Sequence, residues 1–278
     1  MTKIRTSKSA IKNTLLRLHL PDFTRVFITL AGCGGTGSHI ASGLAPIALA
    51  LHERGVTCDL RFVDPDVVER KNVGRQLFAT ADIGKPKAAV LANRLNAAYG
   101  LRVESLAEPL SSIVVRQDAP SPRESPWVNV VIGAVDNAKA RALIAKFVTV
   151  ADGRLWWLDA GNERETGQVG LGNVPAGQVG RPQLGLVDRL PMPSAVHPDL
   201  IIPSPARRRG RAVASCAGAL AAGEQSLVVN RMAAAWALSM LHDFLVTHSL
   251  AYFSVSFNLR WGAAQAIAID AKTLKQYA

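Results

Sequence analysis

The sequence predicts an α/β protein with a mostly parallel sheet, helices on both faces and a C-terminal antiparallel portion. Short β-branched runs alternate with helix-like segments from residue 26 to about residue 160, which is typical of βαβ units. A glycine-rich turn joins the first predicted strand to the first predicted helix. Two apolar runs close the chain, and their spacing predicts a β-hairpin.

The parallel part is expected to contain strands and helices in strict alternation. The strands are short apolar runs, at residues 26–31, 60–64, 103–106, 128–132 and 155–159. The helices lie between them, at residues 36–52, 86–99 and 137–150. Pro86 suits the first position of its helix, and Gly100 suits the stop.

The pattern changes beyond residue 160. We expect a short strand, a long helix and the closing hairpin, at residues 168–171, 217–246, and 252–259 with 264–269. Residues 175–215 are rich in proline and arginine and show little periodicity. The predicted organisation is therefore a basic segment at residues 1–23 and one domain at residues 24–278, with residues 175–215 as a long, mobile crossover loop.

Composition excludes several classes of protein. Hydrophobic residues make up 49% of the 278 residues and charged residues 19%, which favours a large core over disorder. No apolar run approaches the roughly 20 residues that span a bilayer, and the basic start has no continuous apolar stretch of a signal peptide. We expect a cytoplasmic protein without a membrane segment.

The three cysteines are Cys33, Cys58 and Cys216. No Cys-x-x-Cys pair is present, so the sequence predicts neither a disulfide framework nor a zinc site. This pattern fits a reducing compartment. Cys58 is expected to precede a strand and to be buried.

The formal net charge of +11 is unevenly placed. Six Lys and Arg against one Asp give +5 in residues 1–25, and six Arg against two Asp give +4 in residues 181–215. Such blocks are solvated, mobile segments in most proteins. The alternative is a surface for an acidic partner, with a protein tail favoured over nucleic acid.

The motif Gly32-Cys33-Gly34-Gly35-Thr36-Gly37 follows a strand and opens a helix. Its glycines allow a tight turn and a close approach of backbone to phosphate, and the helix N-terminus supplies N–H groups. The alternative is a structural turn. In this context a nucleotide site is favoured, although the motif does not choose between NAD, FAD and ATP.

Asp64 comes at the end of the second predicted strand. A carboxylate there can accept hydrogen bonds from ribose hydroxyls, and the Gly loop and this strand end are neighbours in such folds. The alternative is an Asp that starts the Asp64-Pro65-Asp66 turn. We expect Asp64 to bind ribose.

Further polar residues lie beyond the carboxyl ends of the parallel strands, where open α/β sheets bind their ligands. They are Asn72, Arg75, Gln76, Lys87 and the pair Asp136-Asn137. Arg75 and Lys87 can neutralise phosphate charge, and Asp136 can hold Mg²⁺. This set suits chemistry at a triphosphate better than hydride transfer.

Five segments together resemble the motif series of the ThiF/MoeB/HesA family. They are GCGGTGSH, FVDPDVVERKNVGRQ, DIGKPKA, IGAVDN and GEQSLVVNRMAA. Within the family, the chain most resembles the ThiF-family member of plasmid-borne PRTRC systems. The resemblance runs from about residue 24 to the C-terminus. It implies a Rossmann-like fold, a homodimer, and adenylation of the C-terminal glycine of a ubiquitin-like protein with ATP and Mg²⁺.

The resemblance assigns roles to single positions. Gly32, Gly34, Gly35 and Gly37 match the nucleotide loop, and Asp64 matches the ribose-binding carboxylate. Asn72 and Arg75 match the pair on the ATP phosphates, with Gln76 beside them. Lys87 matches the catalytic lysine, and Asp136 matches the Mg²⁺-linked aspartate.

Two departures from the family stand out. The zinc-binding cysteine pairs are absent, which implies no zinc. The N-terminal segment that gives an arginine to the partner subunit's site is also missing, and Arg17 or Arg25 could replace it. Cys216 falls where some members carry a cysteine that bonds to the activated protein. Its alternative role is a small residue before the helix.

Three functions follow from these residues. The first is an adenylating enzyme in which Arg75, Lys87 and Mg²⁺ stabilise charge. The second is a non-catalytic, nucleotide-binding adaptor. The third and weakest is an NAD(P)-dependent oxidoreductase.

Overall fold

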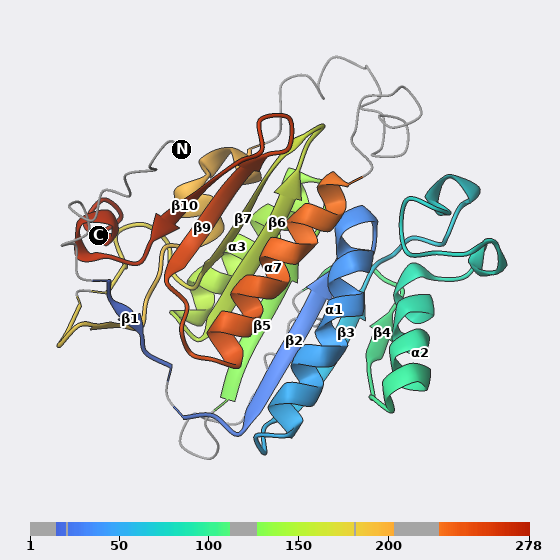
Figure 1. Cartoon of the computed structure of the whole chain (residues 1–278), viewed down its shortest axis with the longest axis horizontal. Coiled ribbons are helices and arrows are strands. Elements are labelled where there is room, and N and C mark those ends of the chain that lie inside the picture. Colours follow the sequence, from blue (N-terminus) through green and yellow to red (C-terminus); the bar gives the residue numbers. More distant parts are fainter. Residues whose placement is uncertain (1–14, 21, 112–126, 181, 203–227) are drawn as a thin grey trace, which may run out of the picture.

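A computed structural model describes residues 15–20, 22–111, 127–180, 182–202 and 228–278. Across these residues one sheet has eight strands in the order β10-β9-β7-β6-β5-β2-β3-β4 (Figure 1). The parallel strands are β2 (Arg25–Ala31), β3 (Thr57–Val63), β4 (Glu104–Leu106), β5 (Trp127–Gly133) and β6 (Leu155–Asn162). The antiparallel strands are β7 (Thr166–Gly172), β9 (Tyr252–Asn258) and β10 (Ala263–Ala268). The predicted fold class and the closing hairpin are thus confirmed.

Helices cover both faces of this sheet. On one face lie α1 (Gly35–His52) and α7 (Val229–Leu245) side by side, and α2 (Lys87–Tyr99) packs beside β4 (Figure 1). The opposite face carries α3 (Ala138–Ala151). The short α4 (Pro193–Val196) also contacts β6 and β7, and α8 (Ala271–Leu274) lies near the C-terminus.

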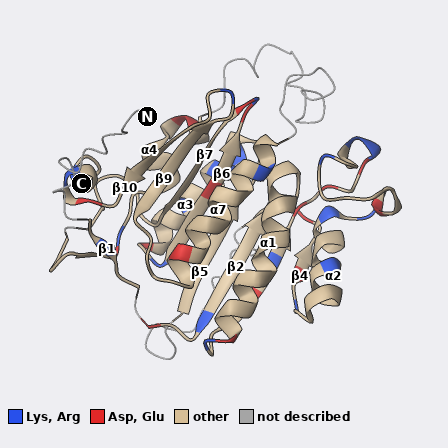
Figure 2. Cartoon of the chain, viewed as in Figure 1, with Lys and Arg blue, Asp and Glu red and all other residues tan. Residues whose placement is uncertain are grey.

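Apolar side chains on both faces form the core. On the face of α3, Trp157 packs with Val131 and Ile144. On the opposite face, the ring centroids of Trp156 and Phe244 lie 4.7 Å apart. Figure 2 shows Lys, Arg, Asp and Glu in the loops, on the helices and on the strands, with wide uncharged stretches between them. Successive side chains of β6 therefore serve the two cores in turn, as the period of a strand requires.

A glycine sets the close packing of α1 on α7. A Cβ atom at Gly43 would lie 2.1 Å from a methyl group of Leu238, so the Leu238 side chain would have to move to admit one.

Several boundaries differ from the prediction. The second strand begins at Thr57, not at residue 60, so Cys58 lies within β3 and is only half-buried. The prediction placed Cys58 before the strand because the mixed sequence of residues 57–59 does not mark a strand. Of the predicted helix 217–246, the described part begins at Val229; residues 217–227 lie outside the described residues.

The predicted crossover loop contains ordered, packed elements as far as residue 202. It holds β8 (Leu186–Val187), α4 and η3 (Pro198–Ile201). Leu190 is fully buried, and Val187 and Leu200 are nearly so. The remainder of residues 175–215, beyond residue 202, lies outside the described residues, as do the arginines at 207–211 and Cys216.

The N-terminal segment packs on the domain before residue 24. The strand β1 (Arg17–Leu18) pairs in parallel with β8, and the N–H of Leu16 donates to the carbonyl of Ile269 at 2.9 Å. Residues 1–14 lie outside the described part of the chain. None of the described helices is long and apolar enough to cross a membrane.

Candidate functional site

The glycine-rich loop leaves β2 at the carboxyl edge of the sheet and enters α1. Gly32 has a φ of +90°, and a Cβ atom there would lie 2.5 Å from the carbonyl oxygen of Ala134. A Cβ atom at Gly37 would lie 1.9 Å from the carbonyl oxygen of Gly32. The loop is therefore pressed against the loop that follows β5, and only glycine fits at these two positions.

Asp64 follows β3 and fastens the glycine-rich loop. Its Oδ2 accepts a hydrogen bond from the Cys33 N–H at 2.6 Å, and its Oδ1 accepts one from the Asp66 N–H at 2.8 Å. The side chain is buried. Burial raises the pKa of Asp64, and the two backbone hydrogen bonds oppose that rise. Asp64 thus starts the turn to Asp66 and also lies beside the glycine-rich loop.

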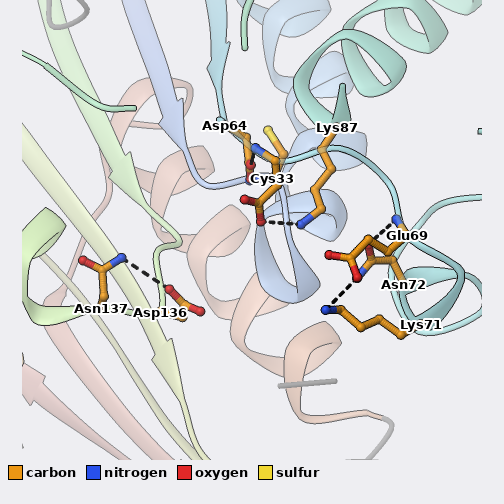
Figure 3. Close-up of polar contacts among 9 residues, drawn as sticks. Cys33, Asp64, Glu69, Lys71, Asn72, Lys87, Asp136 and Asn137 are labelled. Carbon is orange, nitrogen blue, oxygen red and sulfur yellow. Dashed lines mark hydrogen bonds and ion pairs between the residues drawn. The ribbon is translucent and has the colours of Figure 1, made fainter. Parts of the chain in front are cut away.

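Lys87 begins α2 and reaches back toward the same loop (Figure 3). Its Nζ lies 2.8 Å from Oδ2 of Asp66, and its N–H donates to the carbonyl of Asp66 at 3.0 Å. The Lys87 side chain is 7% exposed and that of Asp66 is 63% exposed. Asp66 was not among the predicted site residues, although it stands two residues after Asp64 in the quoted motif.

Asn72 ends η1 (Arg70–Asn72), and Arg75 and Gln76 lie in the turn that follows. Oδ1 of Asn72 accepts from the Glu69 N–H at 2.8 Å, and the Asn72 carbonyl accepts from the Gln76 N–H at 3.0 Å. Gln76 is nearly buried, and its Nε2 lies 3.9 Å from the position of a Cβ on Gly34. Its Oε1 has no hydrogen-bond partner within the described residues. The turn thus presents polar side chains beside the glycine-rich loop.

Asp136 lies on the loop after β5 and is exposed. Oδ1 of Asp136 accepts a hydrogen bond from Nδ2 of Asn137 at 3.3 Å (Figure 3), and Asn137 caps α3 by accepting from the Ala140 N–H at 2.8 Å. The contact of Ala134 with Gly32 holds this loop beside the glycine-rich loop. In the described part of the chain no three His, Cys, Asp or Glu side chains gather to hold a metal.

A polar cluster that the sequence analysis missed joins α1, β6 and α7. Nδ2 of Asn162 donates to Oγ1 of Thr36 at 2.6 Å and to Oδ1 of Asn230 at 3.1 Å. Oγ1 of Thr36 donates in turn to Oδ1 of Asn230 at 3.0 Å. A Cβ at Gly35 would lie 2.8 Å from the Asn230 amide. The first turn of α7 is therefore fixed against the first turn of α1.

A second buried polar group lies under the loop of Asp136. The Nε of Arg141 donates to both oxygens of Asp159, at 3.0 and 3.1 Å. Asp159 is 1% exposed, and burial raises its pKa while Arg141 opposes that rise. Farther along the same face, His197 Nε2 lies 3.2 Å from Ser254 Oγ.

A comparison of the whole sequence with models of known protein families agrees with the order of these loops. Residues 17–269 match the model of the ThiF family. The chain belongs to the ThiF family. The match covers the glycine-rich loop, the loops after β3 and β5, and the antiparallel end of the sheet. No curated protein matches the sequence closely enough to count as a relative.

Solved structures show the same fold at low identity. Escherichia coli MccB with ATP is 17% identical, with a TM-score of 0.56 over 88% of this chain and 64% of that chain. MccB with AMPCPP and MccA is 18% identical, with a TM-score of 0.55 over 88% and 64%. PaaA is 17% identical, with a TM-score of 0.55 over the same shares. The chain thus spans less than two thirds of the length of these proteins.

Arg17 and Arg25, the two candidates to replace the missing N-terminal arginine, lie away from the glycine-rich loop of their own chain. Arg25 begins β2, at the opposite end of the strand from Gly32, and its Nε lies 2.9 Å from Oδ2 of Asp59. Arg17 lies in β1, beside β8. Neither belongs to the set of side chains around the loop within one copy of this ThiF-family chain.

Proposed function

We propose that this ThiF-family protein uses ATP and Mg²⁺ to adenylate the C-terminal carboxylate of a small ubiquitin-like protein that ends in glycine. The observation that carries the proposal is the convergence of Asp64, Gln76 and Lys87 on the glycine-rich loop. The nearly buried Lys87 places its charge beside the loop. There it opposes the rise in the pKa of Cys33 that burial and Asp64 cause. Hydride transfer needs no such cation.

In the proposed site the glycine-rich loop and the N-terminus of α1 face the phosphates, since backbone N–H groups and the helix dipole favour anions there. Asp64 accepts hydrogen bonds from the ribose. Arg75, Asn72, Gln76 and Lys87 contact phosphate oxygens. The exchange of Lys87 from Asp66 to a phosphate keeps its charge paired, which a nearly buried lysine requires.

A carboxylate oxygen of the partner attacks the α-phosphorus, and the bond from that phosphorus to the bridging oxygen of the β-phosphate breaks. Pyrophosphate leaves with the electron pair. The carboxylate is ionised at neutral pH, so the step needs no general base. The residues act by positioning and by stabilising charge. When bound, Mg²⁺ neutralises phosphate charge, with Asp136 as its protein ligand.

The partner, oligomeric state and setting belong to the same proposal. A structure in which MccB holds MccA with AMPCPP supports a peptide or protein substrate. We propose a homodimer in the cytoplasm, no zinc, and a role in a plasmid-borne PRTRC system. The proposal includes a second step, transfer of the activated acyl group to Cys216, which lies outside the described part of the chain.

Exchange of labelled pyrophosphate into ATP, dependent on the partner, tests the enzyme. The protein should also bind ATP with Mg²⁺ much more tightly than NAD, because Arg75 and Lys87 suit a triphosphate. Tighter binding of NAD in calorimetry would support the oxidoreductase instead. One alternative is a non-catalytic, nucleotide-binding adaptor. The ion pair of Lys87 with Asp66 favours it if the lysine keeps Asp66 as its partner when nucleotide binds. ATP binding without exchange in the presence of the partner would support that adaptor.

A further inference from the structure

Two residues of the glycine-rich motif carry side chains, Cys33 and Thr36. The N–H of Cys33 donates to Oδ2 of Asp64 at 2.6 Å. Oγ1 of Thr36 donates to Oδ1 of Asn230 at 3.0 Å and accepts from Nδ2 of Asn162 at 2.6 Å. The motif is therefore anchored at both of its non-glycine positions, by residues that are distant in the sequence.

The anchor at Thr36 is a closed triangle of three side chains. Nδ2 of Asn162 also donates to Oδ1 of Asn230 at 3.1 Å, so each side chain bonds to both others. Thr36 and Asn230 are each 6% exposed. The three residues come from the first turn of α1, the end of β6 and the first turn of α7. Such a network favours one arrangement of these elements, because another would leave buried polar groups unpaired.

The amide of Asn230 also covers the backbone at the start of α1. A Cβ atom at Gly35 would lie 2.8 Å from Nδ2 of Asn230. The N–H of Ser38 donates to the carbonyl of Gly34 at 2.9 Å, so the N–H groups of residues 35–37 precede the first hydrogen bond of the helix. Asn230 thus contacts the turn whose N–H groups meet the phosphates in the proposed function.

The anchor bears on affinity because the loop is rich in glycine. Glycine has many backbone conformations open to it, so ordering such a loop around a ligand costs conformational entropy. A loop that its own chain holds in the binding conformation avoids part of this cost, and the ligand binds more tightly. The buried hydroxyl of Thr36 is engaged by the two asparagines, which fits a role in holding the turn.

We propose that Asn162 and Asn230 are positioning residues for the nucleotide and that they act through Thr36. They hold the first turn of α1 in the orientation in which its N–H groups meet the phosphates. The inference rests on the proposed function for the identity of the ligand. It makes the end of β6 and the start of α7 determinants of ATP affinity, although neither asparagine contacts the nucleotide.

Calorimetry on the full chain, with ATP and separately with adenosine, tests this role. Thr36→Val keeps the shape of the side chain and removes the hydroxyl. It should weaken ATP binding roughly three- to tenfold, the factor that one net hydrogen bond is worth. The affinity for adenosine should stay unchanged, because adenosine has no phosphate. Thr36→Ser should restore the ATP affinity, and Asn230→Ala should reproduce the loss.

Asn173→Ala is the matched control. Asn173 is 1% exposed, and its side chain makes three hydrogen bonds, to the backbone of Gly153, Asp188 and Leu190. Gly153 precedes β6, at the end of that strand opposite to Asn162. Asn173→Ala should lower Tm and keep the ATP affinity. A similar loss of ATP affinity in Asn173→Ala, or equal losses for ATP and adenosine in Thr36→Val, would overturn the positioning role.

A double-mutant cycle separates positioning from direct contact with the nucleotide. If Thr36 acts with Asn230, the loss of ATP affinity in Thr36→Val combined with Asn230→Ala should be smaller than the product of the two single losses. Losses that multiply would mean that the hydroxyl meets the nucleotide independently, and they would overturn the positioning role.

Pyrophosphate exchange keeps the two proposals apart. Unchanged ATP affinity in Thr36→Val, in a protein that catalyses exchange, would overturn the positioning role and leave adenylation standing. Losses confined to ATP, in a protein that shows no exchange with any carboxylate partner, would refute adenylation and keep the positioning role.

Discussion

Lys87 Nζ lies 2.8 Å from Oδ2 of Asp66, so the lysine that the family resemblance marks as catalytic forms an ion pair within its own chain. The pair joins a nearly buried cation to a carboxylate that is mostly exposed. An exposed carboxylate is readily rehydrated when its partner moves away. The arrangement therefore allows Lys87 to exchange Asp66 for a phosphate without leaving an unpaired charge in the interior.

Lys87→Ala should lower kcat for ATP–pyrophosphate exchange by roughly a hundredfold or more, judged by single electrostatic donors in other enzymes. Asp66→Asn should have a much smaller effect on kcat, because it removes only the carboxylate that pairs with Lys87 and leaves the lysine in place. Lys71→Ala is the control, since Lys71 forms an exposed ion pair with Glu69 on a neighbouring turn. A rise in KM alone for Lys87→Ala would make Lys87 a binding residue.

Asp136 and its neighbour Asn137 should respond differently to substitution. Asp136→Ala should lower Mg²⁺-dependent turnover by orders of magnitude. Its Tm should stay unchanged, because the Asp136 side chain is exposed in a loop. Asn137→Ala should instead lower stability by about 1 kcal/mol through loss of the helix cap on Ala140. Thermal unfolding and exchange assays on both variants check this, and unchanged turnover in Asp136→Ala would remove it from the mechanism.

Gly37→Ala should abolish ATP binding and destabilise the fold by roughly 1–3 kcal/mol, since the new methyl group would meet the Gly32 carbonyl. Gly55→Ala is a matched control: Gly55 has a φ of +76°, but nothing lies within 4 Å of the position of its Cβ. It should cost about 1–2 kcal/mol of backbone strain and leave ATP affinity intact. Calorimetry with ATP distinguishes the two, and normal ATP affinity in Gly37→Ala would contradict the role of the loop.

The stability of the fold should decrease as pH falls below about 6.5, in part through His197. Burial lowers the pKa of His197 from 6.5, although Asp199 and Asp159 oppose the shift. The unfolded chain therefore takes up this proton at a higher pH than the folded chain. The stability that neutral His197 contributes is complete above pH 6.5 and is lost as pH falls through the lower folded pKa. In urea unfolding between pH 5 and 8, the free energy of unfolding of His197→Gln should depend less steeply on pH. Some dependence should remain, because the pKa of His39 is lowered as well. An identical slope in His197→Gln would exclude this residue.

The thiols should divide by reactivity. Burial raises the pKa of Cys58 to about 12 and that of Cys33 well above its usual value, so both should resist alkylation in the native protein at pH 8. With partner and ATP, a nucleophilic Cys216 would form a thiol-sensitive adduct on a non-reducing gel. Cys216→Ala should abolish the adduct and leave exchange intact. Robust exchange without any adduct would mean that the reaction ends at the adenylate.

The sequence by itself determined the class of the fold and the place of the glycine-rich loop. Alternation of apolar runs predicts βαβ units because strands and helices bury their residues with different periods. The crowded surroundings of Gly32 and Gly37 explain why a glycine motif is so informative there. Asp64 could be placed beside the loop because parallel strands end at one edge of a sheet.

Only the tertiary structure decided which side chains meet across long separations. Thr36 and Asn162 are 126 residues apart, and Thr36 and Asn230 are 194 apart; no periodicity links them, because their contact depends on how α1, β6 and α7 pack. The same holds for His39 and Arg231, which share a hollow. Residues 175–202 lacked a recognisable pattern since their elements are very short, and their burial comes from packing against the sheet and not from local sequence.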